Sequence, residues 1–347
     1  MSAHESMASL AMATPQDDAL PRGWEAMDAP RVPTTPVPMC PVCDNPHQTD
    51  YASGYDYELE TCRNRWQMVQ CQGCSHVWLN PRPAVDALST IYPPSYYAYN
   101  YDSQVSPLAI AAKQWIDRRK MAGVRKALSA PARSFVDIGC GNGRLLETMH
   151  GLGVPRDRCY GLELDQQVVQ NLNEQGFSAY CERVETCSDI PAGQIDLATM
   201  FHVIEHVDDP GVVVERVADW LSPEGVFVLE TPNLESLDAR LARRTFWGGY
   251  HIPRHWNLFT PETITHLLER HGLEVIDIRY QSGHSFWIYS LHHRLRYGRP
   301  RLPRLARWCN PFRNLPLLAL ATGFDRLRAM MGMKTSAMLV TARKRSN

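Results

Sequence analysis

Nine residues near the middle of the chain, FVDIGCGNG at 135–143, constrain the fold more than any other segment. The first four are mainly apolar and β-branched or aromatic, as a buried parallel strand requires. Three glycines at alternate positions then predict a turn too tight for side chains, and a helical pattern begins at Arg144. A strand, a glycine turn and a helix bring backbone N–H groups close to a ligand at the carboxyl end of a sheet. The segment therefore predicts an α/β domain with a ligand site directly after one of its strands.

The acid inside this strand and the spacing of the glycines limit what the ligand can be. The pattern is G-x-G-x-G, whereas nicotinamide enzymes have G-x-G-x-x-G. Asp137 argues against a pyrophosphate and favours a cofactor that carries a cationic or amino-acid group. About twenty residues later the apolar run CYGLELD at 159–165 ends in acids, where a carboxylate can bind both hydroxyls of a ribose.

Four motifs in chain order resemble the class I S-adenosylmethionine-dependent methyltransferases. They are VDIGCGNG at 136–143, GLE at 161–163, FHVIEHVDDP at 201–210 and LSPEGVFVLETPN at 221–233, and the resemblance extends from about Ser134 to Lys344. It implies an α/β fold with a Rossmann-like, mostly parallel seven-stranded sheet, and S-adenosyl-L-methionine as the cofactor. A Rossmann-like domain that binds another nucleotide is the alternative interpretation.

The resemblance also implies which residues hold the cofactor. Asp137 helps to neutralise its charged amino-acid end, and the backbone at Gly139 and Gly141 approaches it closely, which only glycine permits. Glu163 binds the ribose. Phe201 stands at the family position whose backbone lines the methionine moiety.

Candidate catalytic residues lie in FHVIEHV at 201–207. His206 stands where related enzymes present a histidine to the acceptor, and imidazole is the usual base near neutral pH. The alternative is that Glu205 and His206 only begin and cap a helix. His202, Glu205, His206 and the distant His255 also resemble the E-x-x-E-H plus His set that holds a divalent metal in small-RNA 2′-O-methyltransferases, and ubiquinone-pathway O-methyltransferases have a similar E-x-x-E-H. His202 replaces the first Glu of that set, which argues against Mg²⁺ because this ion prefers oxygen ligands.

Four of the ten cysteines form two C-x-x-C pairs, Cys40 with Cys43 and Cys71 with Cys74, separated by 27 residues. Two short turns that each present two thiolates can complete a closed tetrahedral zinc site, whose role is structural. The interval exceeds the usual length of roughly 15–20 residues, so a hairpin or loop must fill it. The apolar residues that flank the second pair look like strands of a zinc ribbon, and four ordinary reduced cysteines are the alternative.

The order of these motifs predicts four segments. They are a disordered leader (1–38), a zinc ribbon (39–80), a helical and tyrosine-rich connector (81–133) and the methyltransferase domain (134–347) with a basic insertion at 284–335. In the domain we expect strands at 134–139, 159–164, 177–181, 195–201, 226–231, 273–280 and 336–342, and helices near 143–152, 166–176, 211–221 and 261–271. Strand alternating with helix favours a sheet covered on both faces.

The connector and the basic insertion have several interpretations. Five tyrosines in 92–101 either pack between two domains or line the cleft for cofactor or substrate. The insertion holds nine arginines and Lys334 against one acid, Asp325. It fits a lid for an anionic substrate, an interfacial patch that contacts a membrane, or a helical hairpin with arginines on a solvated face. No apolar run approaches the length of about eighteen residues that a spanning helix needs, and the N-terminus lacks a secretory pattern, so the sequence predicts a cytoplasmic protein.

The combination of ribbon, N-P-R-P at 80–83 and tyrosine-rich run resembles methyltransferases of bacterial surface-polysaccharide and natural-product pathways. This implies a small-molecule or glycan acceptor methylated on oxygen, although sugar C-methyltransferases share a related zinc module, so carbon stays open. An RNA methyltransferase is a second alternative, but a net charge of −1 and a pI near 6.9 offer no broad face for phosphates. A scaffold that binds cofactor without turnover is the third.

Overall fold

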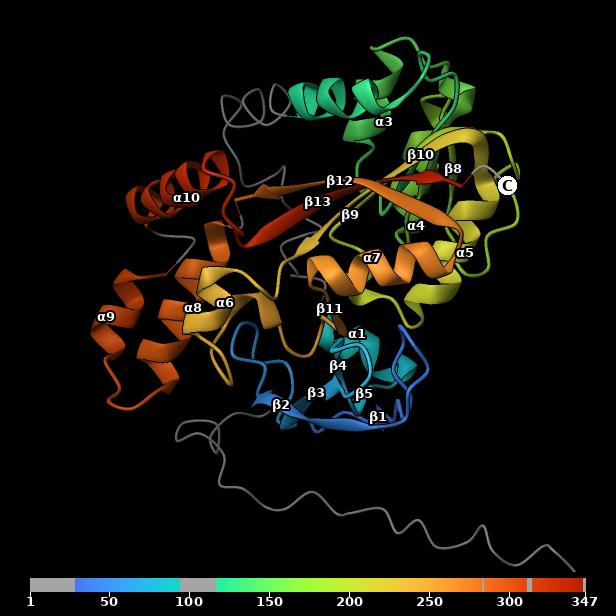
Figure 1. Cartoon of the computed structure of the whole chain (residues 1–347). Helices are drawn as coiled ribbons and strands as arrows, with labels where there is room; N and C mark the ends of the chain where they lie inside the picture. The colour runs from blue at the N-terminus through green and yellow to red at the C-terminus, as the bar shows by residue number, and fades with distance from the viewer. Residues whose placement is uncertain (1–28, 94–116, 283, 311–313, 346–347) are drawn as a thin grey trace, which may run out of the picture.

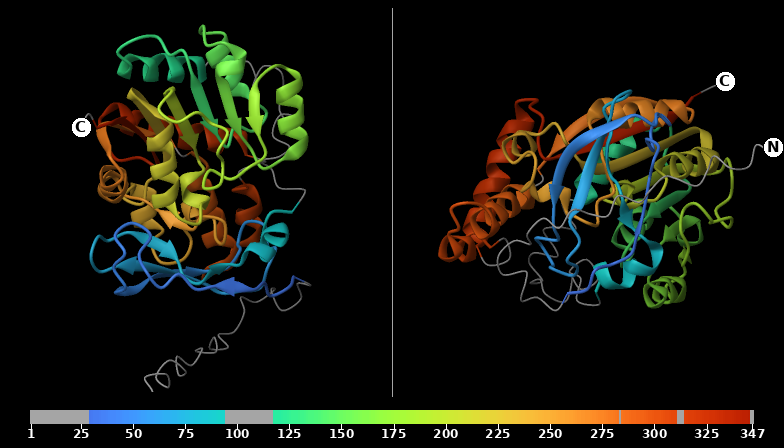
Figure 2. Two further views of the ribbon diagram at one scale, coloured as in Figure 1. Left: turned by 90° about the vertical axis from the view of Figure 1, so that its right-hand side faces the viewer. Right: turned by 90° about the horizontal axis from the view of Figure 1, so that it is seen from below.

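A seven-stranded sheet occupies the centre of the molecule, with helices on both of its faces (Figures 1 and 2). The structure, a computed structural model, describes residues 29–93, 117–282, 284–310 and 314–345. The strands of this sheet are β6 (Phe135–Ile138), β7 (Cys159–Leu162), β8 (Ser178–Tyr180), β9 (Ile195–Phe201), β10 (Leu221–Pro232), β12 (Leu273–Gln281) and β13 (Ala337–Lys344). Each of them coincides with a strand expected from the sequence, and only their ends differ.

The order of the strands places the ligand site. It is β8-β7-β6-β9-β10-β13-β12, in which β8 to β10 run parallel and β13 lies antiparallel between β10 and β12. The chain leaves β6 towards β7 on one side of the sheet and returns to β9 on the other. Ligands of such sheets bind outside the carboxyl ends of the strands at this switch point. The predicted Rossmann-like, mostly parallel sheet is therefore confirmed.

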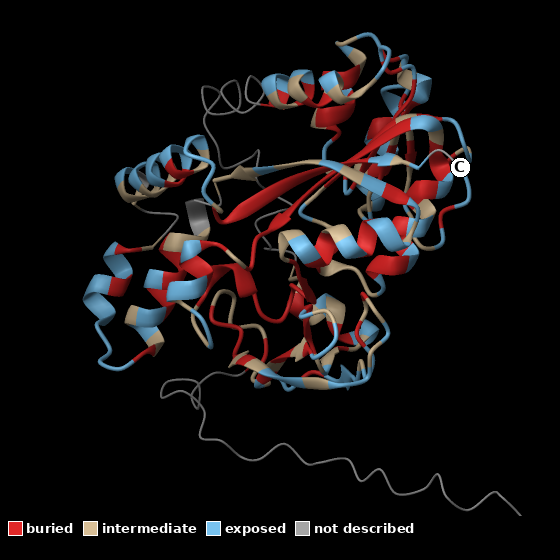
Figure 3. Ribbon diagram, in the orientation of Figure 1, coloured by how far each residue is buried: buried red, intermediate tan, exposed pale blue. Residues whose placement is uncertain are grey.

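Successive side chains of the strands point to opposite faces of the sheet and form two apolar layers. Figure 3 shows that the central strands are largely buried. Phe227 and Leu229 of β10 belong to one layer, and Val226 and Val228 to the other. Helices α5 (Pro210–Trp220) and α7 (Pro261–Arg270) contribute to the first layer, and α3 (Arg144–His150) and α4 (Gln166–Glu174) to the second. Both α5 and α7 begin with a side-chain cap, Asp209 or Thr260, followed by proline, as helix N-termini favour.

A smaller, four-stranded antiparallel sheet lies below the large one in Figure 1. Its order is β11-β4-β3-β2, with β2 at Gln48–Gly54, β3 at Trp66–Cys71, β4 at Val77–Leu79 and β11 at Asn257–Leu258. Strands β2, β3 and β4 come from the predicted ribbon, but β11 comes from the segment between β10 and α7. Buried tryptophans from both parts, Trp66 and Trp247 among them, share one cluster. The smaller sheet is thus completed by a strand from the part of the chain that forms the seven-stranded sheet.

The remaining elements are short, or belong to the basic insertion. They are β1 (Thr34–Thr35), which pairs with β5 (Arg82–Pro83), α1 (Leu88–Ile91), α6 (Leu237–Leu241), α8 (His284–Tyr297), α9 (Pro303–Trp308), α10 (Leu315–Met330), and the 3₁₀ turns η1 (Val85–Ala87), η3 (Arg125–Ala127), η4 (Arg156–Arg158), η5 (Ile204–His206) and η6 (Gly248–Tyr250). In its described residues the insertion therefore has three helices, α8, α9 and α10, which differs from a simple helical hairpin. No helix within the described ranges is long and apolar enough to cross a membrane.

Parts of the predicted leader and connector lie outside the described residues, namely 1–28 and most of the tyrosine-rich run, 94–101. Within the described part of the leader, Thr34 and Thr35 form a strand. The limits of the four segments stay predictions.

Candidate active site

The glycine turn after β6 is shaped by its surroundings. Gly139, Gly141 and Gly143 have φ angles of 72°, 50° and 76°, which other residues rarely adopt. A Cβ atom on Gly139 would lie 2.5 Å from Val203 Cγ2, and one on Gly143 would lie 2.3 Å from Leu172 Cδ2. A Cβ on Gly141 would meet nothing within 4 Å. Packing thus requires the outer two glycines, whereas the middle one borders open space in which a ligand fits.

Two carboxyl groups flank this turn. Glu163, directly after β7, accepts hydrogen bonds from the N–H of Gly141 at 3.0 Å and of Leu164 at 2.7 Å. Asp137 is buried in β6 and accepts a hydrogen bond of 2.7 Å from Thr199 Oγ1. Burial raises the pKa of Asp137 to about 7, so a cationic ligand group beside it would favour the ionised form. Their chemistry fits S-adenosylmethionine, with Asp137 near the ammonium group and Glu163 near the ribose.

A charged cluster closes the carboxyl ends of β9 and β10. Lys120 forms an ion pair with Glu230, and its Nζ lies 4.0 Å from the ring centre of Phe201. His202, in a left-handed conformation with φ of 57°, has Nδ1 3.1 Å from Glu205 Oε1 and Nε2 3.5 Å from Glu230 Oε1. Although burial opposes it, these two carboxylates raise the pKa of His202 above its ordinary value. His202 is thus protonated and paired with two carboxylates, and a protonated imidazole cannot act as a general base.

His206 lies in η5, and its surroundings define its protonation. Nδ1 is 2.9 Å from the carbonyl oxygen of Arg254 and 3.1 Å from the hydroxyl of Tyr92. Because a carbonyl oxygen only accepts, we assign the proton to Nδ1 and the lone pair to Nε2. Burial lowers the pKa of His206 to about 4, so the ring is neutral at pH 7. The helix-cap alternative does not hold, because Asp209 caps the following helix.

A second neutral imidazole lies beside His206. The ring centres of His206 and His255 are 4.7 Å apart, and Nδ1 of His255 donates to the carbonyl of Gly249 at 2.8 Å. Burial lowers the pKa of His255 well below its ordinary value. Ligand atoms of Glu205, His206 and His255 lie within 4.8 Å of one another. The carboxylate of Glu205 is buried and accepts a hydrogen bond from Thr231.

This trio fits a divalent metal ion by the chemistry of its donors. Metal-bound histidines usually donate their second N–H to a carbonyl or carboxylate, and both His206 and His255 do so. The donor set of two nitrogens and one carboxylate suits a transition ion better than Mg²⁺. His202 does not belong to this trio, because its ring nitrogens face two carboxylates.

Residues of the loop that follows β2 in the smaller sheet pack against this site. Arg254 and Asp56 form a bidentate pair with N–O distances of 3.0 and 2.9 Å, and both side chains are 0% exposed. Although burial opposes ionisation, the charge of Arg254 lowers the pKa of Asp56. Nearby, His251 is hydrogen-bonded to Glu58. The backbone that carries His255, and whose Arg254 carbonyl accepts the hydrogen bond of His206, is therefore held by acids from the loop that follows β2.

The four predicted zinc ligands also converge. Sγ of Cys40 lies 3.6 Å from that of Cys74, and Sγ of Cys43 lies 3.5 Å from that of Cys71. Four thiolates around one zinc ion at about 2.3 Å would be roughly 3.8 Å apart, so the arrangement fits a closed tetrahedral site. None of the ten cysteines is in a disulfide. His76, which lies two residues after Cys74, is buried and hydrogen-bonded to Asn257.

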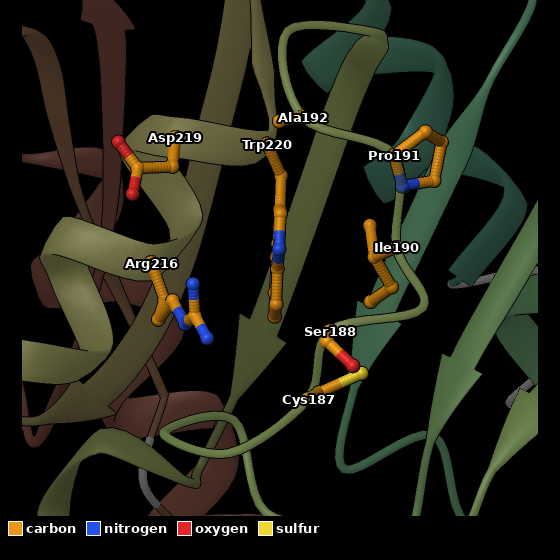
Figure 4. A pocket seen from close by; sticks show the side chains of 8 residues that line it. All are labelled: Cys187, Ser188, Ile190, Pro191, Ala192, Arg216, Asp219 and Trp220. Carbon is orange, nitrogen blue, oxygen red and sulfur yellow. The ribbon is translucent and has the colours of Figure 1, made fainter.

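A separate cavity of about 320 Å³ lies away from these residues (Figure 4). Its lining comes from the loop 187–192 and from Arg216, Asp219 and Trp220 of α5. Ala192 precedes the first residue of β9, and Trp220 precedes the first residue of β10. The cavity is therefore at the amino ends of these strands, the edge opposite to the glycine turn, and is not the cofactor site.

The sequence did not predict several residues of the site, notably Lys120, Glu230, Arg254 and Asp56. Glu230 lies inside the motif LSPEGVFVLETPN, and its position at a strand end was a usable signal. Tyr92 opens the tyrosine-rich run and contacts His206, so this tyrosine borders the site; residues 94–101 of the run lie outside the described residues. Asp56 and Arg254 carried no local signal, because 198 positions separate them.

Known proteins resemble the chain in this same region. A family model described as "Methyltransferase domain" matches residues 111–278. A ubiquinone biosynthesis O-methyltransferase of Thiobacillus denitrificans is 30% identical over 145 residues, 40% of this chain and 56% of the relative. A probable S-adenosylmethionine-dependent methyltransferase of Mycolicibacterium smegmatis is 28% identical over 171 residues, 47% of this chain and 60% of the relative. The chain thus spans little more than half the length of these relatives.

One solved structure is similar over most of the chain. It is the Burkholderia thailandensis 1,6-didemethyltoxoflavin-N1-methyltransferase with bound 1,6-didemethyltoxoflavin and S-adenosylhomocysteine. It is 14% identical, with a TM-score of 0.46, and the match covers 80% of this chain and 99% of that chain.

Proposed function

We propose that this chain, whose residues 111–278 match a family model described as "Methyltransferase domain", is a class I S-adenosylmethionine-dependent methyltransferase that methylates a hydroxyl group of a small molecule or glycan. When bound, the cofactor supplies an electrophilic methyl group on a sulfonium sulfur. The observation that most supports oxygen as the acceptor is the neutral imidazole of His206, placed directly beyond the strand that ends in Phe201. Relatives named as O-methyltransferases agree with this choice.

Different residues of the chain bind different parts of the cofactor. Asp137 balances the cofactor's ammonium group, Glu163 binds the ribose, and the backbone at Gly139 and Gly141 permits close approach. Phe201, covered by Lys120, borders the methionine end. A buried or half-buried carboxylate that pairs with a ligand cation gives a charge-assisted contact, which is stronger than a neutral one.

His206 then acts on the acceptor. Its Nε2 takes the proton of the hydroxyl, while Nδ1–H stays bonded to the carbonyl of Arg254 and keeps the ring in the productive tautomer. The low pKa keeps His206 neutral across the physiological range, so the base is always available. General-base catalysis typically contributes a factor of about 10²–10⁴ to the rate, and the low pKa of His206, which makes it a weaker base, places it toward the lower end of this range.

A second candidate mechanism rests on the convergence of Glu205, His206 and His255. There these residues would hold a divalent ion, which would supply a Lewis acid to orient the acceptor hydroxyl and lower its pKa. The two mechanisms differ in two respects that can be measured. A chelator that removes this ion while metal analysis shows the structural zinc retained abolishes activity in the second and leaves it unchanged in the first. His255→Ala should be as damaging as His206→Ala only in the second.

Zinc completes the proposal, as a structural ion bound by Cys40, Cys43, Cys71 and Cys74. The small sheet that these residues anchor holds Asp56 and Glu58 against the site. We infer that zinc acts on methyl transfer only through this support.

The acceptor can be found by comparing cells with and without the gene. Mass spectrometry of glycans and small metabolites should show species that differ by one methyl group. Purified protein with labelled S-adenosylmethionine should then methylate the unmethylated species, and the Glu163→Ala variant should not. Salt-dependent binding of RNA, or cofactor binding with no transfer to any extract, would contradict the proposal.

A further inference from the structure

The outward face of helix α10 is apolar, which reverses the pattern of an ordinary surface helix. Leu320, Phe324, Leu327 and Met331 follow one another at spacings of four, three and four residues, so they lie on one face. Leu320 is 71% exposed and Leu327 is 56% exposed. Met330, beside this stripe, is 85% exposed. α10 therefore presents a continuous apolar stripe to solvent.

The rotation of α10 is fixed by polar groups on its inner face. Asp325 is 0% exposed and accepts hydrogen bonds from Trp287 Nε1 at 3.0 Å and Ser336 Oγ at 2.8 Å. Arg328, also buried, pairs with Asp325 and donates to the carbonyl of Lys334. A buried ion pair tolerates little displacement, because separating its charges leaves each unpaired in a low dielectric. The apolar stripe is thus held outward by the fold.

Helix α9 repeats this arrangement at the same end of the molecule (Figures 1 and 3). Leu302, Leu305 and Trp308 are 44%, 45% and 60% exposed, while Ala306 and Cys309 face inward. α8 contacts both α9 and α10. Ten of the seventeen large apolar side chains exposed in the described ranges belong to residues 284–335. Such a concentration marks an interaction surface and not ordinary scatter.

The charge of this surface indicates its partner. Residues 284–335 carry nine arginines and Lys334 against Asp325, a net charge of +9 for the segment, so the rest of the chain carries −10. Among these cations, Arg328 pairs with Asp325, and Arg296 and Lys334 pair with Glu60 and Glu235 outside the segment. The single acid is buried and paired. A second copy placed symmetrically on the surface would bring like charges together, which disfavours a dimer there. An anionic lipid surface complements the arginines and accepts tryptophan and leucine side chains at its boundary.

We propose that α9 and α10 form a docking surface for an anionic lipid bilayer. The stripe of α10 and the Leu302, Leu305 and Trp308 side chains enter the interface, and the neighbouring arginines contact lipid phosphates. The helices lie on the membrane and do not cross it. This inference does not depend on the methyl-transfer proposal, because none of these residues belongs to the candidate active site.

Co-sedimentation of the full chain with vesicles tests the proposal. The wild type should bind vesicles of equal parts phosphatidylglycerol and phosphatidylcholine, weakly bind phosphatidylcholine alone, and lose affinity as salt rises. Leu320→Ser combined with Phe324→Ser should reduce binding by at least about tenfold, because apolar burial at the interface is lost. Leu241→Ser is the matched control, since this leucine is 72% exposed on α6, outside the insertion.

A second variant keeps the test valid if the stripe variant folds poorly. Arg304→Gln combined with Arg307→Gln changes only exposed charges, and should weaken binding to the anionic vesicles by about fivefold for each arginine. Thermal unfolding of both variants should match the wild type within about 2 °C. The proposal is overturned if the wild type does not co-sediment with anionic vesicles. It is also overturned if both variants bind these vesicles as tightly as the wild type does. A dimer that the stripe variant converts to monomer, without vesicle binding, assigns the surface to a second copy instead.

Discussion

Removing the charge of Asp56 should destabilise the whole molecule, although the residue lies outside the seven-stranded sheet, in the loop that follows β2. Asp56→Asn preserves the size of the side chain but removes the carboxylate that forms the bidentate pair with the buried Arg254. Breaking one partner of a buried ion pair costs about 3–5 kcal/mol. For a chain of this size roughly 1.4 °C of thermal midpoint is lost per kcal/mol, so the midpoint should fall by about 4–7 °C.

An exposed ion pair provides the matched control. Arg156 and Glu147 pair at 2.9 Å, with side chains 35% and 47% exposed, so Glu147→Gln should cost less than about 1 kcal/mol. Asp56→Leu combined with Arg254→Met should be more stable than either single variant, because no unpaired charge remains. Differential scanning calorimetry measures all four proteins. An Asp56→Asn midpoint within about 2 °C of the wild type would show that the pair does not link the two halves energetically.

The same pair should impose a pH dependence. The folded pKa of Asp56 is depressed, so its stabilisation is fully present above the ordinary aspartate pKa of about 3.9. It is lost as the pH falls through the lower, folded pKa. The difference in midpoint between the wild type and Asp56→Asn should therefore be constant from pH 6 to 8 and shrink below about pH 4.

The remaining predictions concern the cofactor site, the base and the zinc site. His206→Ala should lower the methylation rate by about 10²–10⁴-fold with nearly unchanged affinity for S-adenosylhomocysteine, and a folded variant with near wild-type turnover would exclude both catalytic mechanisms. Glu163→Ala should weaken S-adenosylhomocysteine binding by about 2 kcal/mol or more in calorimetry, and an unchanged affinity would contradict the assignment of the ribose site. Because burial raises the pKa of Asp137 to about 7 in the ligand-free protein, cofactor binding should release a proton and tighten as the pH rises from 6 to 8, whereas Asp137→Asn should show no such dependence. Cys71→Ser should lose zinc by metal analysis and unfold the small sheet, and wild-type protein purified without chelator but free of zinc would refute the zinc site.

Local patterns predicted the sheet and the proposed cofactor contacts because both are encoded over a few neighbouring residues. A strand of alternating apolar residues, the glycines of the turn and the acid of Glu163 all act within one β–α unit. The two-residue strand β11 has no periodicity to detect, and its pairing with β4 depends on the tertiary fold. No local rule could join it to the ribbon.

The protonation states of His202 and His206 also could not be predicted from the sequence. An imidazole with an ordinary pKa predicts a rate that rises through pH 6–7 at His206. Burial lowers that pKa to about 4, although the hydrogen bond to the carbonyl of Arg254 opposes the shift, so any rise in rate should come near pH 4 instead. His202, which looked equivalent in the motif, is stabilised as a cation by Glu205 and Glu230. Environment, not residue type, separates the two histidines.

Strand β11 has a consequence for how the protein is made. During synthesis the cysteines and strands β2 to β4 leave the ribosome long before residues 257 and 258 exist. Until then β4 is an edge strand with unpaired backbone groups, which is a hazard for pairing with other chains. Zinc binding at an early stage would protect the nascent sheet during this interval. For the same reason residues 39–80 are not a module that can be exchanged between relatives unless the segment around β11 is exchanged with them.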